Sequence, residues 1–201
     1  MPEGECTTNQ VVSNDGWLSA GCGGRGLVVW PWDLSDSGQL YDFPDTNMNA
    51  VSLSDDGRRV LVARFHQFKL TQNSFSAVIE GGRLIWEDHT RSGGLGLSPD
   101  GEWLLKTTAT GFEVIHIDSG RVHSVQSKVI GTIDWSADSS QVLLGFQEGA
   151  VKVFAVGRDG VHEVLRHRLA LKGGVHTLFA DSKLKHWVHI ERGDVRVFGD
   201  R

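Results

Sequence analysis

The sequence predicts an all-β fold made of repeated sheets, because turn signals recur about every forty residues and alternating strands lie between them. The turn signals read VVSNDGW, SLSDDGR, GLSPDGEW, DWSADSSQ and LFADSKLK. One aspartate in each signal marks the repeat, and these aspartates are Asp15, Asp56, Asp100, Asp138 and Asp181. Consecutive aspartates are separated by 41, 44, 38 and 43 residues. A period of about 40 residues is the length of one four-stranded blade of a β-propeller.

Strands are expected in a fixed order inside each period. An apolar strand follows each turn, over residues 16–20, 59–63, 102–107, 141–146 and 185–190. A glycine turn and a strand of alternating side chains come next, as in GLVVW, GFEVIHI, GAVKVFAV and GDVRVF. Such alternation is typical of a strand with one buried face. A final polar strand, such as RVHSVQS or HEVLRHR, fits an outer edge that faces water. No stretch shows a helical period.

A single domain is expected over residues 1–201, since one domain is the default for this length. Its blades are expected at approximately 7–43, 48–89, 92–127, 129–170 and 173–201. The last blade has no evident fourth strand, and an unpaired strand edge is a site for pairing. Three alternatives remain open: residues 1–6 close the ring imperfectly, the last blade has three strands, or another chain, such as a second copy, completes the sheet.

Residues 97–120, LSPDGEWLLKTTATGFEVIHIDSG, resemble the core of a WD repeat. The resemblance rests on a Pro-Asp-Gly turn, a strand, a glycine hairpin, a second strand and a glycine-ended turn. Ile117 and Asp118 stand where that family has Trp-Asp, and Trp32 and Asp33 supply the dipeptide itself in the first blade. The family's Gly-His dipeptide is absent, and so is the aspartate of the middle hairpin, so its buried polar network is not expected here.

The resemblance implies that binding loops lie on the top face, in the middle hairpins and in the connections between blades. Blade two carries a long insert, ARFHQFKLTQNSF, over residues 63–75, and exposed aromatic and basic side chains suit a binding hot spot. Alternatively, Phe65 and Phe68 pack the insert onto the body. The predicted binding residues are Arg64, Phe65, His66, Gln67, Phe68 and Lys69 of the insert, with Arg25, Lys106, Gln147 and Arg192 elsewhere on this face.

Three of the seven tryptophans start the same strand of the repeat, namely Trp17, Trp103 and Trp187. A recurring position indicates a recurring structural role, so these three are expected to pack between blades.

No catalytic residue, metal site or cofactor is predicted. The nine histidines form no H-E-x-x-H pair, and the two cysteines form no Cys-x-x-Cys pair. The aspartates fall mainly in turns, which their side chains stabilise. No G-x-S-x-G, P-loop or dinucleotide fingerprint is present.

The predicted function is a non-catalytic protein–protein interaction scaffold, a subunit of a larger complex. The alternative is a small-ligand or glycan-binding propeller, with or without catalysis on glycans. A protein partner is expected, or a homo- or hetero-oligomer formed through the open edge of the last blade. The net charge of -5 disfavours a nucleic-acid partner. No segment reaches the roughly 18 apolar residues of a membrane span, and no secretory signal begins the chain, so a cytoplasmic location is expected.

Overall fold

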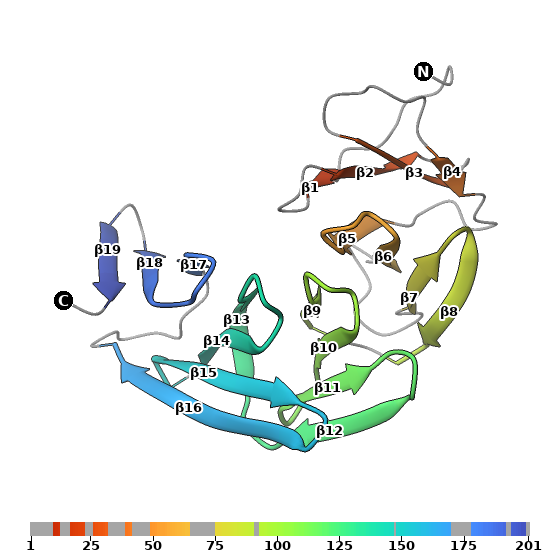
Figure 1. The fold of residues 1–201 in the computed structure, drawn as a ribbon. Coiled ribbons are helices and arrows are strands. Elements are labelled where there is room, and N and C mark those ends of the chain that lie inside the picture. The colour runs from red at the N-terminus through yellow and green to blue at the C-terminus, as the bar shows by residue number, and fades with distance from the viewer. Residues whose placement is uncertain are drawn as a thin grey trace. The chain divides into compact units, whose positions relative to one another are not determined.

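Five antiparallel sheets make up the regular structure of the described residues (Figure 1). The computed structural model describes residues 10–12, 17–22, 26–31, 39–41, 49–64, 75–90, 93–146, 148–169, 178–191 and 194–199. Four sheets have four strands, and the described part of the fifth has three. Each strand pairs with its neighbour in the chain, so every sheet is a meander. The all-β prediction is confirmed.

The strands of the five sheets follow one another in chain order. Sheet 1 contains β1 (Gln10–Val12), β2 (Trp17–Cys22), β3 (Gly26–Pro31) and β4 (Gln39–Tyr41). Sheet 2 contains β5 (Asn49–Leu53), β6 (Arg59–Arg64), β7 (Phe75–Glu80) and β8 (Arg83–Asp88). Sheet 3 contains β9 (Leu95–Leu97), β10 (Trp103–Thr107), β11 (Phe112–His116) and β12 (Arg121–Val125). Sheet 4 contains β13 (Val129–Trp135), β14 (Gln141–Phe146), β15 (Ala150–Gly157) and β16 (Gly160–Arg168). Sheet 5 contains β17 (Leu178–Ala180), β18 (His186–Glu191) and β19 (Asp194–Gly199).

The chain divides into two compact units, each with its own core. Unit 1 comprises residues 1–91 and 99–102, and unit 2 comprises residues 92–98 and 103–201. The core of unit 1 includes Val60 and Val62 of β6, which pack with Ala77 and Ile79 of β7. Unit 2 has two clusters, one built on β10, β11, β13, β14 and β15 and one on β14, β15 and β18.

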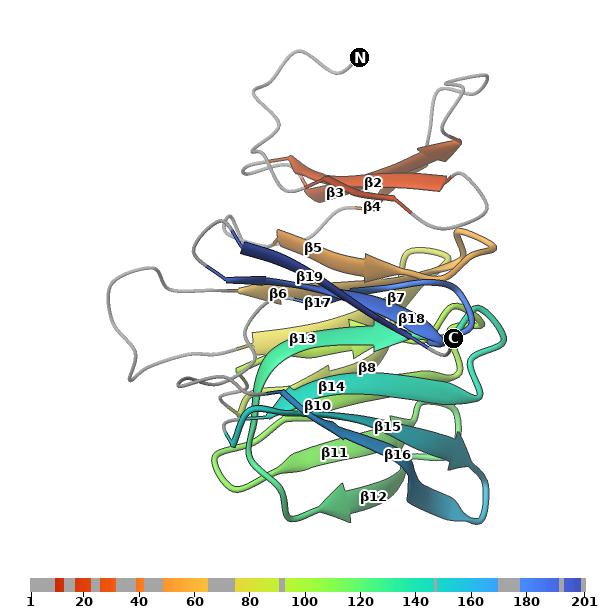
Figure 2. The ribbon, with the colours of Figure 1, turned by 90° about the vertical axis from the view of Figure 1, so that its left-hand side faces the viewer.

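Burial falls from the inner to the outer strands of unit 2. All five residues of β10 are buried, whereas β16 is exposed from His162 to Arg168. In Figure 2, β14, β15 and β16 lie side by side in that order, with the polar strand outermost. Trp103 and Trp187 are 6% and 5% exposed, and each belongs to a core cluster that includes side chains of sheet 4, so their predicted packing between sheets is confirmed. The side chain of Trp17 lies outside the described residues.

A turn of the same hydrogen-bonded form joins the first two strands of sheets 2 to 5. In sheet 4, Ser136 N donates to Gln141 O at 3.0 Å, and Gln141 N donates to Ser136 Oγ at 2.9 Å. The first residue of the turn bonds through its backbone to the sixth in every case: Ser54 to Arg59, Ser98 to Trp103, Ser136 to Gln141 and Asp181 to His186. The third residue is Asp56, Asp100 or Asp138 in sheets 2, 3 and 4.

The fifth turn departs from the predicted register. Asp181 occupies the first position, where the other turns have serine, and Lys183 occupies the aspartate position. From this first position the carboxylate of Asp181 accepts from the backbone N–H of Lys185, the fifth residue, at 2.9 Å, a bond that the third-position aspartate makes in the other turns. It also accepts from the backbone N–H of Lys183 at 3.2 Å. Taking Asp181 as the equivalent of Asp138 was therefore wrong by two residues.

The fourth residue of each turn has a left-handed backbone. Its φ is 71° at Gly57, 75° at Gly101, 59° at Ser139 and 54° at Leu184. This conformation is costly for a residue with a Cβ. Ser139 is itself 3% exposed, so Ser139→Gly removes a small buried side chain as well as the backbone strain, and we expect the free energy of unfolding to change by less than about 1 kcal/mol, measured by urea denaturation.

Leu184→Gly is the contrasting variant for this turn. Leu184 is 3% exposed and packs in a core cluster with Leu143 and Trp187. The loss of this buried side chain costs more free energy than glycine recovers by adopting the left-handed backbone without strain. Leu184→Gly should therefore lower the free energy of unfolding. A fall for Ser139→Gly as large as the fall for Leu184→Gly would contradict the assignment of backbone strain to this position.

Candidate functional site

Most of the binding residues predicted from the sequence lie outside the described residues. These are Phe65, His66, Gln67, Phe68 and Lys69 of the insert, together with Arg25, Gln147 and Arg192. Arg64 is the last residue of β6, and its backbone alone is described. Their assignment as binding residues stays a prediction.

Lys106 is described in full and lies within strand β10. The residue is 8% exposed, and Lys106 Nζ lies 3.4 Å from Glu113 Oε2 on the paired strand β11. A buried ammonium that is already paired with a carboxylate is a poor contact for a partner. The burial of Lys106 therefore favours a structural role.

Lys152 of β15 is a second buried cation, which the sequence analysis did not single out. Its Nζ lies 3.0 Å from Glu148 Oε1, donates to Ser127 Oγ at 3.2 Å and lies 4.0 Å from the centre of the Phe146 ring. Burial is the largest single influence on Glu148 and opposes its ionisation, but the hydrogen bond from Lys152, a backbone hydrogen bond and the charges of Lys152 and Arg166 together outweigh it, so the pKa of Glu148 is lowered. These contacts satisfy Lys152 inside unit 2.

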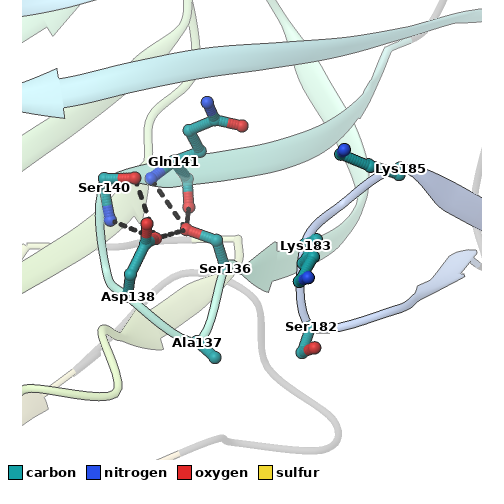
Figure 3. Close-up of a pocket in the computed structure, with 8 residues that line it drawn as sticks. All are labelled: Ser136, Ala137, Asp138, Ser140, Gln141, Ser182, Lys183 and Lys185. Atoms are coloured by element: carbon teal, nitrogen blue, oxygen red, sulfur yellow. Dashed lines mark hydrogen bonds between the residues drawn. The ribbon is translucent and has the colours of Figure 1, made fainter.

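A pocket of about 350 Å³ lies in unit 2 between the turn of sheet 4 and the turn of sheet 5 (Figure 3). Ala137 N donates to Ser182 O at 2.8 Å and so holds the two turns together. The pocket lies at the start of β14, and β14 continues from there toward β15. The lining residues are Ser136, Ala137, Asp138, Ser140, Gln141, Ser182, Lys183 and Lys185.

The carboxylate in the pocket wall belongs to Asp138, and one of its oxygens is bonded within its own turn. Asp138 Oδ1 accepts from Ser136 Oγ at 2.7 Å, from Ser140 Oγ at 2.8 Å and from Ser140 N at 3.1 Å. The bond from Ser136, followed by those from Ser140, lowers the pKa of Asp138. Asp138 is therefore ionised at neutral pH and serves to fix the turn.

The opposite wall of the pocket carries two lysines, whose ammonium groups are not bonded within their turn. Lys183 and Lys185 are exposed, and within the described residues neither ammonium has a hydrogen-bond or ion-pair partner. The carboxylate of Asp181, in the same turn, is held by His186 Nδ1 at 2.8 Å, and this bond is the main reason why the pKa of Asp181 is lowered. The pocket therefore offers two uncommitted cations beside carboxylates that are already bonded.

Asp134 of β13 links sheets 4 and 5 on their inner strands. Its Oδ2 accepts from Ala180 N of β17 at 2.9 Å. Burial raises the pKa of Asp134 above its ordinary value of 3.8, against the opposing hydrogen bonds from the backbone N–H groups of Ala180 and Trp135.

We expect Asp134→Asn to be at least as stable as the native protein at neutral pH. The raised pKa in the folded state means that Asp134 contributes most stability in its protonated form and loses that contribution as the pH rises through its folded pKa. Asparagine keeps an acceptor for Ala180 N–H without the buried charge. Any advantage of the variant should shrink as the pH falls toward 3.8, in denaturant titrations across acidic and neutral pH.

Asp134→Ala is the matched control, because it removes the acceptor and leaves Ala180 N–H without this bond. It should lower the free energy of unfolding by about 1–3 kcal/mol at neutral pH. Equal stability of the alanine and asparagine variants would contradict the role given to this bond.

In the described part of the chain, no three histidine, cysteine, aspartate or glutamate side chains converge in a way that could hold a metal ion. The same part of the chain contains no helix that is long and apolar enough to cross a membrane.

Several plant proteins resemble the chain in sequence, although no family model matches it. They are the small ribosomal subunit protein RACK1 of Brassica napus (29% identity over 151 residues), RACK1z of Arabidopsis thaliana (29% over 151) and RACK1 of Glycine max (30% over 150). Each alignment covers 73% of this chain. The chain spans 38% of the length of these relatives.

Two solved structures share the fold. The β-propeller domain of Cps50 (Swd1) from Myceliophteria thermophila matches with a TM-score of 0.69 and 16% identity, over 99% of this chain and 66% of that one. Hydrazine synthase of Kuenenia stuttgartiensis matches with a TM-score of 0.62 and 13% identity, over 94% of this chain and 70% of that one.

Sheet topology and these likenesses agree on the class of protein. The repeated four-stranded meanders are propeller blades. The chain is a WD-repeat-like β-propeller, similar in sequence to the RACK1 proteins of plants.

Proposed function

We propose that this protein is a non-catalytic scaffold for protein–protein interaction and works as a subunit of a larger complex. The observation that carries the proposal is the set of turns presented by the repeated β-meanders, of which the turns of sheets 4 and 5, with the exposed Lys183 and Lys185, are one example. The propeller supplies a rigid support for these turns, and rigid supports that present exposed turns are typical of binding proteins.

The state of the carboxylates supports a non-catalytic role. A general acid at neutral pH needs a raised pKa and access to substrate. Asp138 and Asp181 line or adjoin the pocket, but their pKa values are lowered. Asp134 has a raised pKa, but its carboxylate is bonded to the backbone of the neighbouring sheet.

The names of the relatives also support a place in an assembly. The RACK1 proteins are named as proteins of the small ribosomal subunit. By analogy with them, we propose a cytoplasmic location for this protein. Hydrazine synthase is an enzyme by name, so the fold alone does not separate a scaffold from a catalyst.

Two surfaces are proposed for the partner besides the pocket. One is the insert of sheet 2, with Arg64 to Lys69 as contacts. The other is the outer edge of β19, which among the described strands pairs with β18 alone and carries Val197 at 72% exposure. An unpaired edge can accept a strand from another chain. We further propose that the 201 residues act as one propeller domain.

Affinity capture of the tagged full chain from its native source tests this function. The expected result is a second protein in fixed ratio, with at least tenfold less of it captured by the triple variant Arg64→Ala, His66→Ala and Lys69→Ala. The control variant, Lys128→Ala with Arg158→Ala, removes two exposed charges elsewhere and should capture as much as the native chain. Recovery of the chain alone would overturn the proposed function.

A further inference from the structure

The turns of sheets 2 and 3 form a pair that can be compared with the pair of turns around the pocket. Within unit 1, Asp55 N donates to Pro99 O at 2.6 Å, just as Ala137 N donates to Ser182 O at 2.8 Å in unit 2. The two bonds join the second residues of consecutive turns. The two pairs of turns can therefore be compared position by position.

In unit 1, an arginine covers the neighbouring turn. Arg59, the sixth residue of its turn, donates from Nη1 to Gly101 O at 3.0 Å, and its Nη2 lies 3.2 Å from Glu80 Oε2. Its side chain is 14% exposed. The space between these two turns is therefore filled by a guanidinium group from the chain itself.

In unit 2, the residue at the same position is too short to do this. Gln141 replaces the arginine, and its side-chain amide has no partner in the described part of the chain. The third residue of the following turn is also reversed in charge, since Lys183 stands where sheet 3 has Asp100. Compared with the turns of sheets 2 and 3, the turns of sheets 4 and 5 therefore lack the arginine on one side and carry lysines on the other. The space between them is open and forms the pocket (Figure 3).

We infer that this pocket binds the carboxylate side chains of an acidic segment in the protein partner. The inference rests on the proposed function and adds the chemistry of the partner. The polar groups left for a ligand are the ammonium groups of Lys183 and Lys185, the amide of Gln141 and the hydroxyl of Ser182, because none of these has a partner among the described residues. The hydroxyls of Ser136 and Ser140 are already bonded to Asp138.

Size and charge both favour this ligand. A volume of about 350 Å³ lies at the lower end of ligand pockets, which suits one or two side chains of a peptide. A cationic ligand would be repelled by two ammonium groups, whereas a carboxylate would pair with them. The one carboxylate in the lining, Asp138, already accepts three hydrogen bonds within its own turn. The negative net charge of the chain opposes an acidic peptide only weakly, because physiological salt screens charges beyond about 8 Å.

The test is fluorescence anisotropy of the full chain with a fluorescein-labelled oligoglutamate peptide, with oligoglutamine as the neutral control. The native chain should bind the glutamate peptide alone. Lys183→Ala with Lys185→Ala should weaken binding at least fivefold, whereas Lys128→Ala with Arg158→Ala, which removes the same charge outside the pocket, should change it less than twofold. Equal weakening by both pairs would overturn the inference.

Gln141→Arg tests the pocket itself. An arginine here should fill the space as Arg59 does in unit 1, and so weaken peptide binding although it adds a positive charge. Unchanged or tighter binding would place the peptide outside the pocket and overturn the inference. Displacement by inorganic phosphate at constant ionic strength, at concentrations where chloride has no effect, would assign the pocket to phosphate instead.

Partner capture separates this inference from the proposed function. Retained capture of the native partner by the Lys183→Ala and Lys185→Ala variant would remove the pocket from the interface and leave the scaffold role standing. Absence of any partner for the native chain would remove the scaffold role, while specific peptide binding would still establish the pocket.

Discussion

Phe146→Ala is expected to lower the free energy of unfolding by about 3–5 kcal/mol, the range for a large aromatic side chain removed from a core. Phe146 is fully buried at the end of β14, and its ring lies 6.1 Å from that of Phe154. The ring also lies beneath Lys152 Nζ. The variant therefore opens a cavity and removes one of the contacts that hold a buried cation. Denaturant unfolding followed by tryptophan fluorescence measures the loss.

Phe146→Leu separates these two effects. Leucine keeps most of the buried apolar volume but has no ring to face Lys152, so the expected loss is smaller, about 1–2 kcal/mol. Val197→Ala, at a side chain that is 72% exposed, should change stability by less than about 0.5 kcal/mol. Equal losses for the alanine and leucine variants would contradict the importance of core volume at this position.

Gly111→Ala is expected to cost about 3 kcal/mol, because the added methyl group has no space. A Cβ at Gly111 would collide with the backbone oxygen of Val125 and would lie 3.0 Å from Ser127 N. These are backbone atoms, so they cannot move aside as the end of a side chain could. Gly111 is also fixed by its hydrogen bonds, with its N–H donating to Thr108 Oγ1 at 3.0 Å.

Gly157→Ala is the matched control for this prediction. A Cβ at Gly157 would meet no atom within 4 Å, and its φ is outside the left-handed region. The variant should therefore change stability by less than about 0.5 kcal/mol in the same unfolding assay. A loss at Gly157 as large as the loss at Gly111 would show that the missing space is not the cause.

The strands were predictable because each follows from local pattern. Residues 141–146 read as an apolar run after a turn, and β14 spans Gln141–Phe146. The polar run HEVLRHR likewise became the exposed outer strand β16. Burial and alternation act over a few residues, so the sequence carries them directly.

The fifth turn shows where local pattern misleads. Asp181 looked like the other turn aspartates because it lies at nearly the same spacing. The carboxylate can replace either the serine or the aspartate of the turn, and only the backbone bond from Asp181 N to His186 O decides between them. One residue type can thus satisfy two positions of the same motif.

The pocket could not be predicted from the sequence for a related reason. It depends on a backbone bond between Ala137 and Ser182, which lie in different sheets. It also depends on the sixth residue of the turn, which is Arg59 in sheet 2 and the shorter Gln141 in sheet 4. That difference becomes visible only after the turns are aligned by their hydrogen bonds, whereas the sequence directed attention to the hairpins at the opposite end of the strands.

The scaffold role is tested most directly by the mass of the protein isolated under native conditions, measured by light scattering after size-exclusion chromatography. The account predicts a mass well above the 22.1 kDa of the chain, with a second protein present in fixed ratio. A single species of 22.1 kDa, free of any second protein, would contradict it.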